Sequence, residues 1–187
     1  MKRLVGFMFI CLIILAGCNS ISNYDDEDVA AIVRGEEITV GEMRFLYPDD
    51  KVLENLDGMI KARLAVQEAK RLNLDVSEKL QEIQETKSSV VEHYPSKDDD
   101  SEMAKEMRQF PDSQAKKLNM DPDEYIVKHY EIMSEISAYM IAYIEEKLGQ
   151  PFESVEVDEA EEFDKKINQL LDTLVEDHKD EIEKFIK

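Results

Sequence analysis

Apolar residues recur every three or four positions along most of this 187-residue chain. That spacing is the period of one face of an α-helix, so it predicts amphipathic helices rather than strands. A weaker helix carries Met103, Met107 and Phe110, and Pro111 is expected to interrupt it. The last run of apolar residues at helical spacing predicts a helix of roughly 27 residues, about 40 Å long, which should pack back along the body of the protein. The other helical stretches are 52–73, 122–148 and about 159–185, together with 77–93, where the apolar spacing is less regular.

Local signals near the N-terminus predict a hairpin and a short helix. An apolar run at 29–33 is followed by Arg34 and Gly35, an order typical of a small β-turn or hairpin. Thr39 precedes Glu42 by three residues, which is the capping-box spacing, so a short helix should start there. The pattern as a whole predicts a mostly α fold with one small β-hairpin.

The helix expected at 122–148 has the clearest boundaries. Asp121 can cap its first turn, Pro122 suits the first helical position, and Gly149 can take the left-handed conformation that ends a helix. Its apolar stripe should be buried and consists of Ile126, Tyr130, Met133, Met140, Ile144 and Leu148.

The first residues have the layout of a signal peptide. Lys2 and Arg3 precede an apolar stretch at 4–16. That stretch makes about 20 Å of helix, which is less than the ~30 Å hydrocarbon core that a transmembrane helix must cross. It closes with Leu-Ala-Gly-Cys, which resembles the lipobox of bacterial lipoproteins, with Cys18 as the lipidated residue. The alternative is an ordinary secretory signal in which Cys18 is incidental.

These features divide the chain into three parts. Residues 1–17 are expected to be a lipoprotein signal peptide, residues 18–28 the lipidated Cys18 with a flexible acidic spacer, and residues 29–187 one helical domain. Two or more acyl chains on Cys18 would hold the protein firmly at the outer, extracytoplasmic face of a bacterial cell membrane. The only other cysteine, Cys11, lies in the signal, so no intramolecular disulfide is expected in the mature chain.

The charge of the chain limits its partners. The formal net charge is −20, and loss of Lys2 and Arg3 with the signal makes it two units more negative. Such a charge repels nucleic acid and anionic lipid head groups. We therefore expect no nucleic-acid partner and a protein that is tethered to the membrane rather than lying on it.

No pattern of residues in the sequence supports an enzyme or a metal site. The three histidines, at 93, 129 and 178, lack the spacing of a zinc site, and His178 is expected to be a half-buried packing residue. The acidic run 98–102 lacks the central glycine and the final glutamate of an EF-hand loop. No nucleophile elbow or phosphate-binding glycine loop occurs. We expect no cofactor beyond the covalent lipid on Cys18.

Three stretches, in this order, carry a family resemblance. The first, 29–39, reads Val-Ala-Ala-Ile-Val-Arg-Gly-Glu-Glu-Ile-Thr. The second, within 56–77, contains Leu-Asp-Gly-Met-Ile, then Gln-Glu-Ala-Lys-Arg-Leu-Asn-Leu and Val-Ser. The third, within 118–147, contains Asn-Met-Asp-Pro-Asp-Glu-Tyr. Together they resemble the N-terminal chaperone region of SurA/PrsA-type foldases, although Arg34 and Asn73 stand where that family has asparagine and glycine.

This resemblance implies an all-helical chaperone-like module whose C-terminal helix packs on the N-terminal helices. The prolyl isomerase activity of the family belongs to a parvulin domain, and the link between 148 and 159 has no room for one. We therefore expect a non-enzymatic binder of unfolded or exported proteins. The alternative is a dedicated adaptor subunit that binds one folded partner at the membrane surface. A homodimer formed by exchange of the long C-terminal helix is also consistent with this family.

The residues expected to contact such clients are flexible or aromatic side chains on the helices. A groove between helices can bind an apolar segment, and methionine adapts to segments of varied shape. Simple core filling is the competing role for each methionine taken alone. The candidates are Met103, Met107, Phe110, Met133 and Met140.

Overall fold

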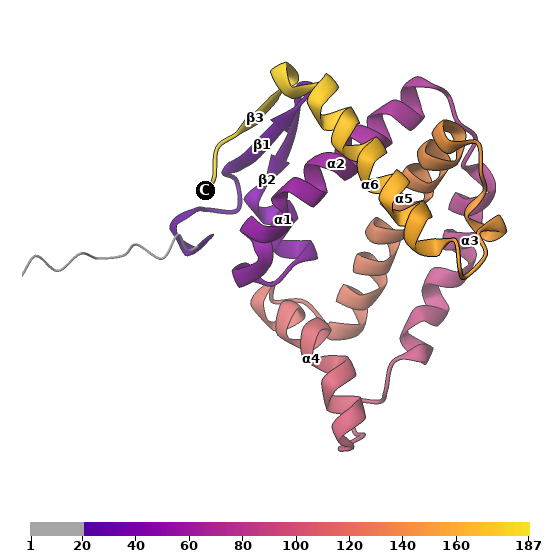
Figure 1. Ribbon diagram of the computed structural model, residues 1–187. Helices are drawn as coiled ribbons and strands as arrows, with labels where there is room; N and C mark the ends of the chain where they lie inside the picture. The colour runs from indigo at the N-terminus through magenta and orange to yellow at the C-terminus, as the bar shows by residue number, and fades with distance from the viewer. Residues whose placement is uncertain (1–20) are drawn as a thin grey trace, which may run out of the picture.

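The computed structural model describes residues 21–187, and in this part of the chain six α-helices accompany a small three-stranded antiparallel sheet (Figure 1). The mostly helical fold class expected from the sequence is thus confirmed. The strands are β1 (Val29–Val33), β2 (Glu36–Thr39) and β3 (Ile182–Lys184). The helices are α1 (Val40–Leu46), α2 (Val52–Arg71), α3 (Ser77–Thr86), α4 (Glu102–Lys117), α5 (Pro122–Leu148) and α6 (Ala160–Asp177). The 3₁₀ helices are η1 (Ile21–Asn23), η2 (Asp49–Lys51), η3 (Lys87–His93), η4 (Phe152–Ser154) and η5 (Lys179–Glu181).

The expected hairpin is present, and the structure adds a third strand to it. Arg34 and Gly35 join β1 to β2 with φ angles of 50° and 81°, both positive, as tight two-residue hairpin turns require. β3 pairs antiparallel with the other edge of β1, where Val33 lies opposite Ile182. The sheet order is therefore β2-β1-β3, and β3 joins the C-terminal end of the chain to the N-terminal hairpin (Figure 1).

The last helix is shorter than its apolar spacing predicted. α6 ends at Asp177, so the expectation of a helix continuing to residue 185 is wrong. The chain turns through η5 and continues as β3, which pairs with backbone N–H and C=O groups at the edge of β1. Ile186 then enters the core with 3% of its surface exposed. α6 does pack back on α2, and its buried residues include Leu171 and Leu174.

Pro111 does not interrupt its helix, contrary to the sequence-based expectation. α4 runs without a break from Glu102 to Lys117 with Pro111 inside it. A proline in a helix leaves the carbonyl four residues earlier without its N–H donor, and here that carbonyl belongs to Met107. Met107 is 45% exposed, so water can replace the missing donor. The proline ring itself is buried, which offsets part of the cost of the lost hydrogen bond.

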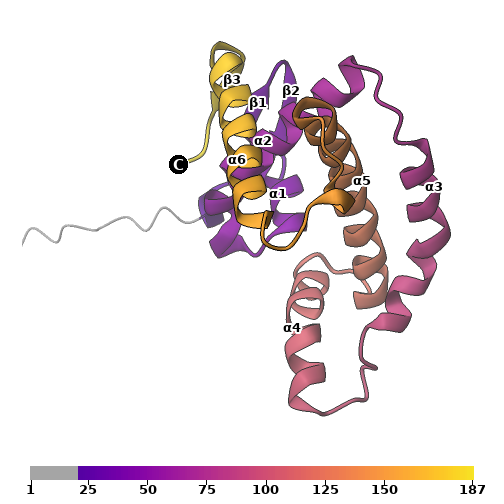
Figure 2. The same ribbon diagram turned by 45° about the vertical axis from the view of Figure 1, so that its right-hand side comes forward.

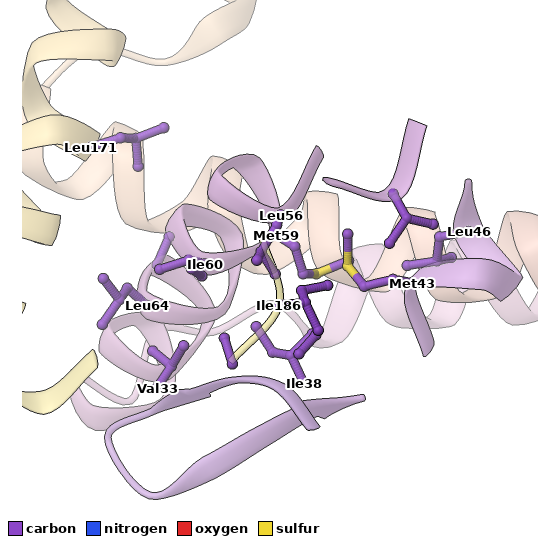
Figure 3. Close-up of a cluster of buried hydrophobic side chains, with 14 of the residues drawn as sticks. Val33, Ile38, Met43, Leu46, Leu56, Met59, Ile60, Leu64, Leu171 and Ile186 are labelled. Atoms are coloured by element: carbon purple, nitrogen blue, oxygen red, sulfur yellow. The ribbon is translucent and has the colours of Figure 1, made fainter. Parts of the chain in front are cut away.

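The hydrophobic core is built around α2. Large side chains that leave water contribute roughly 1.5–3 kcal/mol each, so this cluster is the main source of stability. α5 lies across α2 and adds the buried residues Tyr143 and Ile144. Figure 3 shows how the core side chains converge from the hairpin, α1, α2, α6 and the C-terminus, with Val33, Ile38, Met43, Leu46, Leu56, Met59, Ile60, Leu64, Leu171 and Ile186 labelled.

The segments α3, η3 and α4 lie away from the sheet and pack on α5 (Figure 2). α5 begins and ends as its sequence predicted. The Asp121 carboxylate accepts hydrogen bonds from the backbone N–H groups of Asp123 (2.9 Å) and Glu124 (3.4 Å). Gly149 ends the helix in the left-handed conformation, with φ of 66°. α5 is therefore the common support for the three segments that pack on it.

The expected signal peptide and Cys18 lie outside the described residues. Residues 21–28, the described part of the expected spacer, lie against α1. There Arg44 donates hydrogen bonds to the Asp26 carboxylate (2.6 Å) and to the Ile21 carbonyl (2.9 Å), and Ile21 is 3% exposed. Among the helices of residues 21–187, none is long and apolar enough to cross a membrane.

Candidate client-binding groove

An open pocket of about 270 Å³ lies where η3 and α4 approach α5. It is smaller than the ~300–1,000 Å³ sites that hold whole small molecules, so it suits one or two side chains of a longer ligand. Its lining carries no acidic residue, lysine or arginine, although 35% of the chain consists of charged residues. We call this pocket the aromatic groove, and its residues are Val90, Tyr94, Phe110, Pro111, Tyr125, Ile126, His129, Tyr130, Met133 and Ser134.

The aromatic groove continues along α5 into a second hollow under α3. This hollow has a volume of about 290 Å³ and shares Tyr130, Met133 and Ser134 with the groove. Ile83 of α3 is buried here, and Ala138 and Ile141 extend the apolar surface along α5. The charged side chains of Lys79 and Glu82 also line the second hollow, so the two hollows together form an apolar strip along α5 with a charged edge at α3.

An aromatic cluster forms the floor of the groove. Tyr125, 1% exposed, lies 5.2 Å from the ring of Phe45 and 6.1 Å from the ring of Phe110, measured between centroids. His129 lies 5.5 Å from both Phe110 and Tyr125. Tilted and edge-to-face pairs of this kind add about 0.5–1.5 kcal/mol each beyond burial. The floor is therefore a packed surface rather than a loose collection of side chains.

Polar contacts tie this floor to the end of α1. The Tyr125 hydroxyl donates to the Phe45 carbonyl (2.8 Å), and the Gln114 side-chain amide donates to the carbonyls of Arg44 (2.8 Å) and Tyr47 (3.0 Å). Gln114 is 3% exposed, so these bonds are shielded from water. They satisfy carbonyls at the C-terminal end of α1, which a helix leaves without partners.

Burial favours the neutral forms of the two ionisable groups in the floor. It raises the pKa of Tyr125 to about 12, so the hydroxyl keeps its proton and goes on donating to Phe45 near neutral pH. Burial also lowers the pKa of His129, although a hydrogen bond with the Leu46 backbone opposes this shift. His129 is therefore neutral at pH 7, and the groove presents no positive charge there.

Arg108 holds one side of the groove together. Its guanidinium donates to the Pro95 carbonyl (2.9 Å), to Asp112 of α4 (3.0 Å) and to Asp123 of α5 (3.3 Å). The Arg108 side chain is only 7% exposed. Three segments, the loop after η3, α4 and the first turn of α5, are thus joined through one planar cation. Arginine suits this position because its five N–H donors are fixed in a rigid fork.

A separate set of contacts holds α3 and η3 against α5. The hydroxyls of Tyr130 and Thr86 lie 3.1 Å apart, within hydrogen-bonding distance. The Glu131 carboxylate accepts hydrogen bonds from Lys87 (3.1 Å) and Gln84 (2.9 Å). These groups are largely at the surface, where each contact is worth less than about 1 kcal/mol. This wall is therefore held less firmly than the Arg108 side.

The structure brings together two of the five residues that the sequence suggested. Phe110 and Met133 both line the aromatic groove. Met103 and Met107 are 69% and 45% exposed, and their spacing from Phe110 puts them on the same face of α4, where they extend its apolar surface. Met140 lies elsewhere, half-buried against the hydrophobic core.

Sequence reasoning missed several groove residues. Tyr94, Pro111, Tyr125 and His129 were not singled out as binding residues, and Tyr130 was expected only as part of a buried stripe. A usable signal was the spacing of three and four that places the groove residues of α5 on one face of that helix. The contribution of η3 had no such signal.

The chemistry of the aromatic groove is that of an apolar binding surface. Among residues 21–187, no group of three or more histidine, cysteine, aspartate or glutamate side chains could hold a metal ion. His178, expected to be half-buried, has its side chain 22% exposed; its Nδ1 lies 2.8 Å from the Glu181 carboxylate, and it does not line the groove. Comparison of the chain with protein-family models, curated protein sequences and solved structures finds no match.

Proposed function

We propose that this chain is a lipoprotein, anchored through Cys18 at the outer face of a bacterial membrane, that binds apolar segments of unfolded or exported proteins. The aromatic groove is the observation that supports binding: it is apolar, uncharged and open on a highly charged protein. The signal-like start and the lipobox-like sequence before Cys18 support the anchor. The resemblance to the chaperone region of SurA/PrsA-type foldases supports unfolded or exported proteins as the ligands.

The dimensions of the groove favour weak and unselective binding. One fully buried aromatic or leucine side chain contributes about 1.5–3 kcal/mol, whereas a dissociation constant of 1 µM requires about 8.2 kcal/mol. One or two client side chains in the groove, less the cost of ordering the client, fall short of tight binding. Exposed Met103 and Met107 enlarge the contact without adding specificity, because methionine side chains adapt to varied shapes. Such a surface is suited to binding a client briefly and then releasing it.

We propose that the chain has no isomerase activity of its own, because nothing in it resembles the parvulin domain that carries this activity in the foldases. Its role would be to keep an exported protein from aggregating until that protein folds or is handed on. Such a role requires binding and release but no covalent chemistry.

Suppression of client aggregation by residues 19–187 tests this proposal. The protein at stoichiometric excess should slow the aggregation of a chemically unfolded client, measured by light scattering. Phe110→Ala should weaken the effect because it removes an aromatic side chain from the groove. Phe185→Ala is the matched control, since Phe185 is a 48% exposed phenylalanine on the C-terminal segment, outside the groove. No protection of any client, or equal loss in both variants, would contradict the proposal.

The second candidate function is a dedicated adaptor for one folded partner. The observation that favours it is the rigidity of the Arg108 side of the groove, because pre-organised surfaces suit a single shape. Selectivity separates the two functions. A chaperone should bind many apolar peptides on an array weakly, whereas an adaptor should recover one protein from membranes at near-equal amounts.

A further inference from the structure

Two further hollows lie outside the aromatic groove, and α5 forms part of the first of them. The residues that α5 contributes to this first hollow alternate along the helix with those of the groove and so face another direction; they are Ile132, Glu135, Ile136 and Tyr139. Ile132 is 39% exposed, so solvent reaches this surface. The first hollow has a volume of about 220 Å³ between α2 and α5, and its apolar lining is Met59, Ala62, Val66, Ile132, Ile136 and Tyr139.

The second hollow, which we call the cationic hollow, is lined mainly by basic side chains, although the chain as a whole is acidic. The formal net charge of the chain is −20, yet three cations and one carboxylate line this hollow of about 300 Å³. The carboxylate belongs to Glu36, and the Arg63 guanidinium, 3.5 Å away, partly neutralises its charge. The full lining is Arg34, Glu36, Val66, Gln67, Lys70 and Arg71.

Two of the three cations are fixed in place by one buried carboxylate. Glu68, with its side chain 7% exposed, lies 2.8 Å from the guanidinium of Arg34 and 2.8 Å from that of Arg71. A second carboxylate, that of Glu181, lies 3.7 Å from the Arg34 guanidinium, so the charges of both arginines are balanced. The arginine side chains stay 25% and 56% exposed, so N–H donors that Glu68 holds in place remain accessible to a ligand.

Lys70 joins the cationic hollow to the apolar one. Lys70 and Val66 line both hollows, so the two form one continuous surface. The Lys70 ammonium lies 4.9 Å from the centroid of the Tyr139 ring, and within residues 21–187 no carboxylate pairs with it. An unpaired ammonium beside an apolar hollow favours a ligand whose negative charge stands next to an apolar group.

We propose that these joined hollows, the Lys70 site, bind the C-terminal carboxylate of a polypeptide whose last side chain is apolar. Lys70 and Arg71 receive the carboxylate, and the terminal side chain enters the apolar hollow. This hollow is below the ~300–1,000 Å³ of small-molecule pockets, so it suits one side chain rather than a long acyl chain. The carboxylates of Glu42 and Glu135 in the lining repel a dianion such as phosphate more strongly than they repel a single carboxylate.

Fluorescence anisotropy with short labelled peptides tests the Lys70 site, using the full-length chain in lipid nanodiscs at low salt. A peptide that ends in leucine with a free carboxylate should bind about tenfold or more tightly than the same peptide with an amidated C-terminus. Lys70→Gln should abolish this preference. Lys116→Gln is the matched control, because Lys116 is another exposed lysine without an ion-pair partner among the described residues.

A third variant tests the apolar half separately. Ile132→Ser should weaken binding of the leucine-ended peptide several-fold and keep the preference for acid over amide. Equal binding of the acid and the amide would overturn the proposal. So would displacement of the peptide by inorganic phosphate or by a fatty acid at lower concentration than by the unlabelled peptide. Lys70→Gln should leave aggregation suppression unchanged, and Phe110→Ala should leave binding of the peptide with a free carboxylate unchanged. The proposals for the Lys70 site and for the aromatic groove can therefore be refuted independently.

Discussion

Replacing Arg108 by lysine tests whether one planar cation holds the side of the aromatic groove. Lysine keeps the positive charge and much of the apolar stem, but its single ammonium cannot reach the Pro95 carbonyl, Asp112 and Asp123 together as the guanidinium does. The expected loss follows from the contacts given up. A hydrogen bond from a charged donor, such as the part-buried bond to the Pro95 carbonyl, is worth about 1.5–3 kcal/mol.

The loss of the contacts to the two aspartates adds less to the free-energy cost, because both aspartates are partly exposed. Asp112 and Asp123 have side chains 45% and 38% exposed, so water solvates them once the arginine is gone, and each pair is worth only about 0.2–1 kcal/mol. Lysine retains one of the contacts. We therefore expect Arg108→Lys to lower the free energy of unfolding by about 1–3 kcal/mol, and each 1 kcal/mol lowers the melting temperature by about 2–4 °C in a domain of this size.

Urea unfolding of residues 19–187, followed by circular dichroism, measures this change. The control is Lys105→Gln on the same helix, because the Lys105 side chain is 64% exposed and its partner Asp100 is 98% exposed. That control should stay within about 0.5 kcal/mol of the parent. Hydrogen exchange should also become faster in η3 and at the start of α5, the segments that Arg108 joins. An Arg108→Lys variant as stable as the parent, with unchanged exchange, would refute the reasoning.

Three further predictions follow from other parts of the chain. Cys18→Ala should abolish incorporation of a labelled fatty acid and release the protein from the membrane fraction of cells, whereas Cys11→Ala should do neither. Hydrogen bonds from Arg71 and then Arg34 lower the pKa of Glu68, so its stabilising effect is present above the unfolded pKa of ~4.3 and is lost as pH falls through the lower folded value. The stability difference between the parent and Glu68→Gln, from urea melts, should therefore be large at pH 7 and shrink below about pH 4. Deleting residues 182–187 should destabilise the fold by several kcal/mol, measured by thermal melting, because it removes β3 and the buried Ile186.

The elements that the sequence predicted correctly are those with local signals. The boundaries of α5 follow from Asp121, Pro122 and Gly149, which act on the backbone beside them. β3 has only three residues and no period of its own, and its strand conformation is decided by pairing with β1 far away in the chain. The apolar residue Ile182 fits the helical seam equally well, so the pattern alone extended α6 too far.

The groove, too, could be predicted only in part, because residue type is readable from the sequence whereas the packing of distant segments is not. Phe110 and Met133 could be selected as apolar and adaptable, but only the packing of α4 on α5 brings them together. Met140 follows Met133 by seven residues on the same stripe, and both pack against the hydrophobic core, but only Met133 also lines the groove. Tyr94 reaches the groove through the packing of η3 on α5, which no local signal in that loop indicates.

Methyl NMR of methionine tests the central claim, that clients bind in the aromatic groove, most directly. Residues 19–187, labelled with ¹³C at the methionine methyl groups, would be titrated with a permanently unfolded client. Met133 lines the groove and should shift, and Met107 beside it should shift too, whereas Met43 is fully buried in the core and should not. Phe110→Ala should reduce the shift at Met133. A client that binds without moving the Met133 signal would contradict the account.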